Sequence, residues 1–201
     1  MTFNIDVDEI EKLITSRTKI VLPVHLYGQS CDMTRLEGIA KRHHLFIIED
    51  NAQAHGATWN GKMAGSFGHA NATSFYPTKN LGALGDGGAI TTNDEATARF
   101  VERYRNYGFE SKNSCAEQGV NSRLDELQAL VLSIKLKHLR EWNEQRRAIA
   151  STYLERLKGV GDLQLPNSHP EAYHVYHLFV IRTQRRDKLK EYLASLQVDT
   201  K

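Results

Sequence analysis

Residues 45–50 read Leu45-Phe-Ile-Ile-Glu-Asp50, an apolar run of strand length that ends in two carboxylates. A second mostly apolar run, Ile20-Val-Leu-Pro-Val-His-Leu-Tyr27, precedes it. Nearly continuous apolar strands are typical of parallel sheets that are covered on both faces. Between the two runs, Asp32 can cap a helix that extends to about His43. Strand, helix and strand in this order predict a mostly parallel α/β sheet.

The same alternation continues toward residue 110. Two further strands are predicted at Ala72–Tyr76 and Gly88–Thr92, and a glycine-rich stretch lies between them. A helix is predicted from Asp94 to about Tyr107, stopping at Gly108, because glycine readily adopts the conformation that ends helices. The first part of the chain is therefore expected to hold four sheet strands.

A long helical segment follows the polar loop at 109–121. Residues 122–158 contain neither proline nor glycine, and their apolar side chains recur at helical spacing. This pattern predicts one very long helix, or two in series, that bridges two lobes. A strand at Tyr173–Arg182 and an amphipathic helix at Arg186–Leu196 are expected to begin the second lobe.

The composition is that of an ordinary globular chain. Of 201 residues, 40% are hydrophobic and 25% are charged, and the net charge is +2. This net charge does not indicate a basic surface of the kind that binds nucleic acid. Cys31 and Cys115 have neither metal nor redox spacing, so a reducing cytoplasm is expected. No apolar run approaches a membrane span and the N-terminus lacks a signal pattern, so we expect a soluble cytoplasmic protein.

The candidate site lies at the carboxyl ends of the predicted strands, where open parallel sheets bind their ligands. Asp50 ends one strand, and a partly desolvated carboxylate there needs a cationic partner. It could equally cap the turn formed by Asn51 and Ala52. These two interpretations of Asp50 remain open at this point.

A lysine follows the next strand in Ser74-Phe-Tyr-Pro-Thr-Lys79. A loop lysine is usually a solvated charge, but Pro77 fixes the backbone here and Gly82-Ala-Leu-Gly-Asp-Gly-Gly88 follows. A partly buried lysine is the usual amine nucleophile toward a carbonyl cofactor, and Ser74 could donate to a phosphate. The glycine stretch fits no Walker or dinucleotide pattern, so we favour a tight turn that lets Lys79 approach closely.

Several blocks resemble one family. Residues 49–57, 74–90 and 119–129 are similar to the sugar aminotransferases of the DegT/DnrJ/EryC1/StrS family, as are 23–29 and 176–182. The resemblance covers essentially the whole chain, and the lysine block with its upstream Asp and Gln is highly specific. It implies the aspartate-aminotransferase (type I) fold, pyridoxal 5'-phosphate as cofactor, glutamate as amino donor, and a homodimer with shared active sites.

The resemblance also implies a role for each matching residue. Lys79 would be the catalytic residue and carry the pyridoxal phosphate covalently. Asp50 would pair with the protonated pyridine nitrogen and keep the ring an electron sink. Gln53 would lie near the ring and its phenolic oxygen, and Ser74 would donate to the phosphate. Asn121 would reach the cofactor phosphate of the neighbouring subunit.

Members of this family are longer at both ends. The resemblance therefore implies a partial cofactor-binding large domain at 1–121, a long bridging helix at 122–158 and the start of a small domain at 159–201. The portions absent from this sequence would supply a phosphate-binding turn and an aromatic residue that stacks on the ring. We expect the 201 residues alone to bind pyridoxal phosphate weakly or not at all, and to associate or aggregate. A non-catalytic remnant is one alternative.

The substrate expected by resemblance is a nucleotide-linked keto-deoxysugar, most similar to a dTDP-3-keto-6-deoxyhexose, as in lipopolysaccharide or O-antigen biosynthesis. The alternative is a 4-keto sugar nucleotide. Sugar dehydratases of the same family carry His in place of the Lys, and position 79 is Lys. A nicotinamide dehydrogenase is disfavoured because the dinucleotide fingerprint is missing. The histidines have no ligand spacing and are expected to be structural or at the surface, although His55 lies close to the Asp50 block.

Overall fold

The computed structural model describes residues 2–112 and 114–201. Its main sheet has four strands in the order β1-β2-β5-β6, and β1, β2 and β5 are parallel whereas β6 is antiparallel to β5. The strands are β1 (Ile20–Val21), β2 (Phe46–Asp50), β5 (Ala70–Ser74) and β6 (Gly88–Thr91). The predicted, mostly parallel α/β sheet is confirmed.

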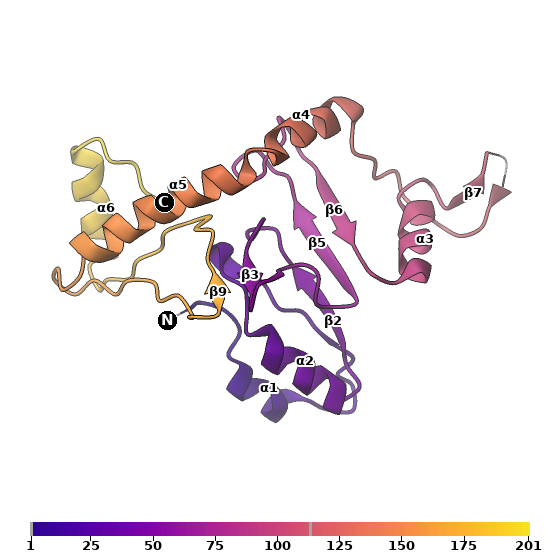
Figure 1. Ribbon diagram of the computed structural model, residues 1–201, viewed down its shortest axis with the longest axis horizontal. Coiled ribbons are helices and arrows are strands. Elements are labelled where there is room, and N and C mark those ends of the chain that lie inside the picture. The colour runs from indigo at the N-terminus through magenta and orange to yellow at the C-terminus, as the bar shows by residue number, and fades with distance from the viewer. Residues whose placement is uncertain (1, 113) are drawn as a thin grey trace.

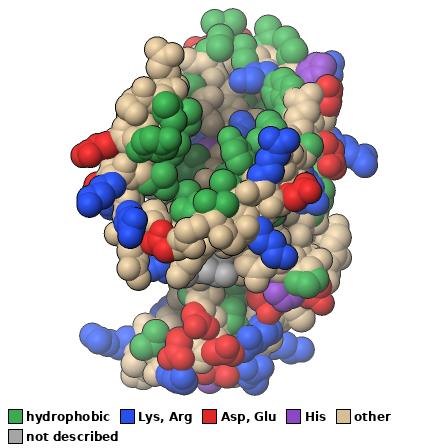
Figure 2. All heavy atoms as spheres, turned by 90° about the vertical axis from the view of Figure 1, so that its left-hand side faces the viewer, with side chains coloured by type: hydrophobic (Ala, Val, Ile, Leu, Met, Phe, Trp, Pro, Cys, Tyr) green, Lys and Arg blue, Asp and Glu red, His purple; other side chains and the backbone are tan. Residues whose placement is uncertain are grey.

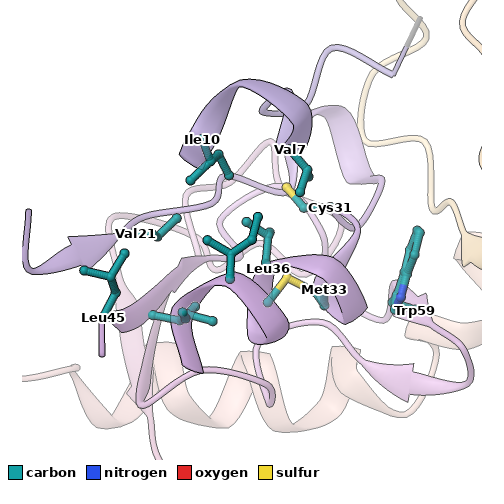
Figure 3. Close-up of a cluster of buried hydrophobic side chains, with 11 residues drawn as sticks. Val7, Ile10, Val21, Cys31, Met33, Leu36, Leu45 and Trp59 are labelled. Carbon is teal, nitrogen blue, oxygen red and sulfur yellow. The ribbon is translucent and has the colours of Figure 1, made fainter. Parts of the chain in front are cut away.

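Two helices cover one face of this sheet (Figure 1): α1 (Val7–Leu13) and α2 (Met33–Arg42). Asp32 caps α2 as predicted, because its side chain accepts a 3.0 Å hydrogen bond from the Arg35 backbone N–H. Figure 3 shows Met33 and Leu36 of α2 in a buried cluster with side chains of α1 and of the strands. This cluster anchors β1 and β2, and the carboxyl end of β2 carries Asp50 of the candidate site.

A small antiparallel sheet joins distant parts of the sequence. Its order is β4-β3-β9, formed by β3 (Thr58–Trp59), β4 (Lys62–Met63) and β9 (Ala172–Tyr173). It brings the segment near residue 172 back to the large sheet, beside the loop that follows β2.

The predicted strand at Tyr173–Arg182 is wrong for most of its length. Tyr176 has φ = 44°, a left-handed conformation that interrupts an extended strand. The segment instead docks on the short 3-10 helix η1 (Leu26–Gly28), where the Val175 N–H donates to the Gly28 carbonyl at 2.9 Å. Gly28 has φ = 99°, and a Cβ there would lie 2.9 Å from the His177 backbone N, so a glycine is required at this contact.

Two helices in series run along one edge of the molecule (Figure 1): α4 (Glu126–Leu136) and α5 (Leu139–Arg156). One of the two predicted arrangements is thus confirmed, with a turn at 137–138 between the helices. The Asp125 side chain caps α4 by accepting from the Leu127 N–H at 2.9 Å. Leu132 of α4 and Leu139 of α5 form a buried cluster with Leu81 and Ala83, which lie at the start of the glycine-rich loop.

The remaining elements flank this frame. They are α3 (Glu95–Tyr104), the hairpin strands β7 (Phe109–Ser111) and β8 (Ser114–Cys115), and α6 (Arg186–Ser195). The helix predicted to reach about Tyr107 ends three residues earlier, and the chain turns at Gly108 with φ = 75°. None of the helices in the described residues has both the length and the apolar composition needed to span a bilayer.

Candidate active site

The carboxyl ends of β2 and β5 bring Asp50 and Ser74 to one edge of the sheet. The two strands are in parallel register, with Asp50 opposite Ala72. Asp50 Oδ1 accepts a 2.9 Å hydrogen bond from the Ala52 N–H, so the turn-capping interpretation of Asp50 is confirmed for this oxygen. Its backbone also bonds to Pro23 and His25 of the neighbouring segment. The cap uses only one of the two carboxylate oxygens.

Lys79 lies in a tight turn directly after β5. Its backbone N–H donates to the Tyr76 carbonyl at 2.9 Å, and the side chain is half-buried. A Cβ at Gly82 would lie 2.4 Å from the Pro77 carbonyl oxygen, so only glycine allows the chain to return so close to the turn. The geometry agrees with the tight-turn interpretation of the glycine-rich stretch.

The charge of Lys79 acts on two histidines, of which His55 is buried and His177 is half-buried. Burial and, to a smaller degree, the charge of Lys79 lower the pKa of His55 to about 4. Burial likewise lowers the pKa of His177 to about 4, with Lys79 again contributing. Both imidazoles are therefore neutral at physiological pH.

Ser74 and Gln53 each accept one hydrogen bond through a side-chain oxygen and keep a side-chain donor that can bond to a ligand. Ser74 Oγ accepts a 3.3 Å hydrogen bond from the Tyr76 N–H, which leaves its hydroxyl hydrogen to donate. Gln53 Oε1 accepts a 2.7 Å hydrogen bond from the Tyr27 N–H, so its NH₂ group is the part available to a ligand. Tyr27 itself has φ = 57°, a backbone conformation that is uncommon for a tyrosine.

Asn121 lies apart from this cluster. It is exposed, pairs with Asn106 in an isolated bridge near the end of α3, and accepts from Arg123 Nε at 3.1 Å. Within the described residues, no hydrogen bond joins it to Asp50, Ser74 or the turn that carries Lys79.

Sequence reasoning missed the role of Glu49. Because side chains alternate along a strand, Glu49 points to the opposite face from Asp50 and is fully buried. It accepts hydrogen bonds of 2.7–2.9 Å from His25 Nε2 and from the backbone N–H groups of Gly65, Phe67 and Gly68. Burial raises the pKa of Glu49, but these donors outweigh it and leave the pKa lowered. The signal in the sequence was the alternation of side chains along the predicted strand, which places Glu49 on the opposite face from Asp50.

A buried amide pair was missed as well. Asn80 Nδ2 donates to Asn143 Oδ1 at 2.8 Å and to the Val175 carbonyl at 3.1 Å. Asn143 Nδ2 donates in turn to the His55 carbonyl at 2.9 Å. The pair ties the residue after Lys79 to α5 and to the C-terminal segment. An asparagine among the apolar positions of α5 was the only signal in the sequence.

The arrangement suits a phosphorylated cofactor with a carbonyl group and a basic ring. An amine, a carboxylate and two spare hydrogen-bond donors meet at one sheet edge. Among the described residues there is no group of three or more His, Cys, Asp or Glu side chains that could hold a metal ion. Figure 2 shows a hollow on one face of the molecule that is bordered by hydrophobic side chains.

Fold and site together define an α/β chain of the aspartate-aminotransferase type, built around a lysine at the carboxyl edge of its sheet. The chain belongs to the DegT/DnrJ/EryC1/StrS aminotransferase family, which matches residues 1–201. One relative is the dTDP-3-amino-3,6-dideoxy-alpha-D-galactopyranose transaminase of Aneurinibacillus thermoaerophilus. It is 54% identical over 99% of this chain and 54% of its own length.

Solved structures agree with this membership. The structure of S. venezuelae DesV in complex with a ketimine intermediate is 48% identical and superposes with a TM-score of 0.95, over 98% of this chain and 53% of that chain. The E. coli GDP-4-keto-6-deoxy-D-mannose-3-dehydratase with bound hydrated PLP is 25% identical with a TM-score of 0.89, over 97% of this chain and 56% of that chain. The chain spans about half the length of the curated relatives that it matches.

Proposed function

We propose that this chain provides the lysine-bearing part of a pyridoxal-phosphate-dependent aminotransferase that acts on a nucleotide-linked keto-deoxysugar. The observation that carries the proposal is the placement of Lys79 in a glycine-enforced turn at the same sheet edge as Asp50. Family membership over residues 1–201 supports it, as does the bound PLP of a solved relative.

Each site residue has a task that its surroundings permit. Pyridoxal phosphate, when bound, would supply an electron sink for the carbon that loses its proton. Lys79 would carry the cofactor and then move a proton as general acid and base. The oxygen of Asp50 that does not cap the turn would hold the protonated ring nitrogen. Ser74 would donate its hydroxyl hydrogen to the phosphate, and the NH₂ group of Gln53 would donate to the phenolic oxygen of the ring.

The substrate that fits best is a dTDP-3-keto-6-deoxyhexose, with glutamate as amino donor. The support is the relative that is 54% identical to this chain, which is a dTDP-3-amino-3,6-dideoxy-alpha-D-galactopyranose transaminase. A 4-keto sugar nucleotide is the alternative. A sugar dehydratase has the same fold, but Lys at position 79 favours amino transfer for this chain.

We further propose that the protein acts in the cytoplasm as a homodimer in which Asn121 serves the neighbouring active site. The exposed position of Asn121, away from the cluster, suits such a role. The proposed domains are a partial cofactor-binding domain at 1–121, the bridging helices at 122–158 and the beginning of a small domain at 159–201.

The decisive experiment is covalent trapping. A preparation of the protein that binds pyridoxal phosphate is mixed with the cofactor, reduced with borohydride and digested, and the modified peptide is identified by mass spectrometry. Modification of Lys79 alone, together with amino transfer from glutamate to a dTDP-3-keto-6-deoxyhexose, is the expected result. Modification spread over surface lysines would overturn the assignment of Lys79. Transfer to 4-keto sugars only would overturn the substrate.

A further inference from the structure

The glycine-rich loop that follows Lys79 runs along helix α4 in the direction opposite to the helix. Figure 1 shows α4 at the end of the main sheet where β5 ends and β6 begins. The Leu84 N–H donates to Gln128 Oε1 at 2.8 Å, and the Gly82 carbonyl accepts from Lys135 Nζ. The two helix residues are separated by about two helical turns, so they lie on one face of α4 and hold alternate residues of the loop.

The same order of contacts extends to both ends of the loop. Asn80 Nδ2 donates to Asn143 Oδ1 of α5 at 2.8 Å, and Asn80 follows Lys79 directly in the sequence. At the other end, a Cβ at Gly87 would lie 2.9 Å from Leu124 Cδ1, just before α4 begins, so a glycine allows this close approach. The loop is therefore supported by the two helices from the residue after the lysine to the start of β6.

The turn that carries the lysine rests on the residue that Lys135 holds. A Cβ at Gly82 would lie 2.4 Å from the carbonyl oxygen of Pro77, and Pro77 lies inside that turn. The next residue, Ala83, donates its N–H to the Phe75 carbonyl at 2.8 Å. Because backbone packs directly on backbone here, a displacement of the Gly82 carbonyl would be transmitted to the turn.

Lys135 is well suited to hold a buried carbonyl. Gly82 is buried, and a buried carbonyl without a donor costs free energy. Lys135 is half-buried, on the same face of α4 as the buried Leu132. Its ammonium group is a charged donor, and such hydrogen bonds are about twice as strong as those between neutral groups.

We propose that Lys135 is a positioning residue, whose ammonium group holds the Gly82 carbonyl and thereby fixes the turn from which the Lys79 side chain extends. Gln128 supports the same loop one contact further along, at Leu84. This inference rests on the proposed function of Lys79. Lys135 acts on the reaction through the turn, so its loss changes the rate of amino transfer rather than the affinity for the substrates.

Amide hydrogen exchange, followed by NMR in cofactor-free protein, tests the positioning. Lys135→Met keeps an unbranched side chain and removes its donor. The N–H groups of Ala83 and Lys79 should exchange at least about 10-fold faster in this variant, because the segment between them loses its support. The Gly68 N–H, which bonds to Glu49 at 2.8 Å, is the internal control and should exchange at an unchanged rate.

Three further variants separate the effect of the donor from that of the side chain's bulk. Lys135→Arg keeps a charged donor and should hold the exchange rates within about threefold of those of the unchanged protein. Lys137→Met removes an exposed ammonium group at the end of the same helix and should change nothing. Gln128→Met should speed the exchange of the Leu84 N–H, which loses its acceptor.

Turnover provides the second measurement, in a preparation that binds pyridoxal phosphate. Lys135→Met should lower kcat by about 10-fold and leave the KM of both substrates within about twofold. Unchanged exchange at Ala83 and Lys79 would overturn the proposal, as would a rise in KM with unchanged kcat. An equal acceleration at Gly68 would also overturn it, because Lys135 would then stabilise the whole fold rather than the turn. The exchange rates are measured without cofactor, so a failure of the proposed function alone remains recognisable.

Discussion

At the scale of single residues, a substitution of Asp50 can test its structural role and its proposed catalytic role separately. Asp50→Asn keeps an oxygen that can accept from the Ala52 N–H, so the turn is preserved. The amide cannot keep a ring nitrogen protonated, so amino transfer should fall by at least about 100-fold while unfolding by urea changes by less than about 1 kcal/mol. Unchanged turnover with collapsed stability would reduce Asp50 to a turn cap.

Lys79→Ala should abolish covalent cofactor binding and all amino transfer. The backbone hydrogen bond from residue 79 to the Tyr76 carbonyl does not depend on the side chain, so the turn should persist. The measurement is the borohydride-trapped adduct together with the turnover rate. Lys158→Ala, at an exposed position on another part of the chain, is the matched control and should behave as the unchanged protein. Retained turnover in Lys79→Ala would exclude the proposed role.

Glu49 should make stability depend on pH. Its pKa is lowered in the folded state, so its stabilisation is present above the unfolded value of 4.5 and is lost as pH falls through the folded value. Glu49→Gln sets an NH₂ group against backbone donors and should cost about 3 kcal/mol near neutral pH. Urea unfolding between neutral and acid pH should show a flatter profile in this variant.

The control for that prediction is Glu37→Gln, because Glu37 is an exposed partner of Lys62 at 3.7 Å. Surface pairs of this kind contribute little, so its stability and pH profile should match those of the unchanged protein. An equally small effect of Glu49→Gln would show that the donors around Glu49 find other acceptors.

The sequence was most informative for reactive side chains that lie at or just after the ends of predicted strands. Asp50 and Ser74 lie on predicted strands and Lys79 follows one, and the parallel sheet brings the ends of these strands to one edge. Glu49, Asn80 and Asn143 were not predicted as functional, because the value of a buried polar group depends on partners that are distant in sequence. Asn80 and Asn143 are 63 positions apart, and no local pattern announces their contact.

At the scale of elements, local signals predicted helices better than short strands. Asp32 and Asp94 cap α2 and α3 through their own side chains, and such caps are encoded within three residues. The extended segment after Tyr173 has an apolar strand pattern but bonds to η1 and turns at Tyr176. Its conformation is set by a tertiary contact with η1, and the local sequence pattern cannot predict such a contact.

The link between α5 and the lysine turn gives a prediction at this scale. Asn143→Ala removes the hydrogen bond to the His55 carbonyl and one of the bonds of Asn80 Nδ2. The loss should cost about 2–3 kcal/mol in urea unfolding, because a buried acceptor is left unpaired. Gln145→Ala, at an exposed position of the same helix, should change stability by no more than about 0.5 kcal/mol. Equal losses of stability in the two variants would show that the amide pair has no structural role.

At the scale of the whole molecule, α4 carries an exposed apolar surface. Leu127, Leu130 and Ile134 lie on one face at helical spacing and are 60%, 57% and 53% exposed. Leu84, whose N–H bonds to Gln128 of the same helix, is 70% exposed. Contiguous apolar surface of this kind is rarely left in contact with water.

We therefore expect the 201-residue chain to associate with itself through the exposed face of α4. Sedimentation velocity and light scattering over a range of concentrations should show species larger than a monomer. Leu127→Gln combined with Leu130→Gln should shift the distribution toward monomer, because it removes apolar area that association would bury. Lys188→Gln combined with Lys190→Gln changes two exposed positions of α6 and should leave the distribution unchanged. A monomer at every concentration before any substitution would show that this face is stable in water.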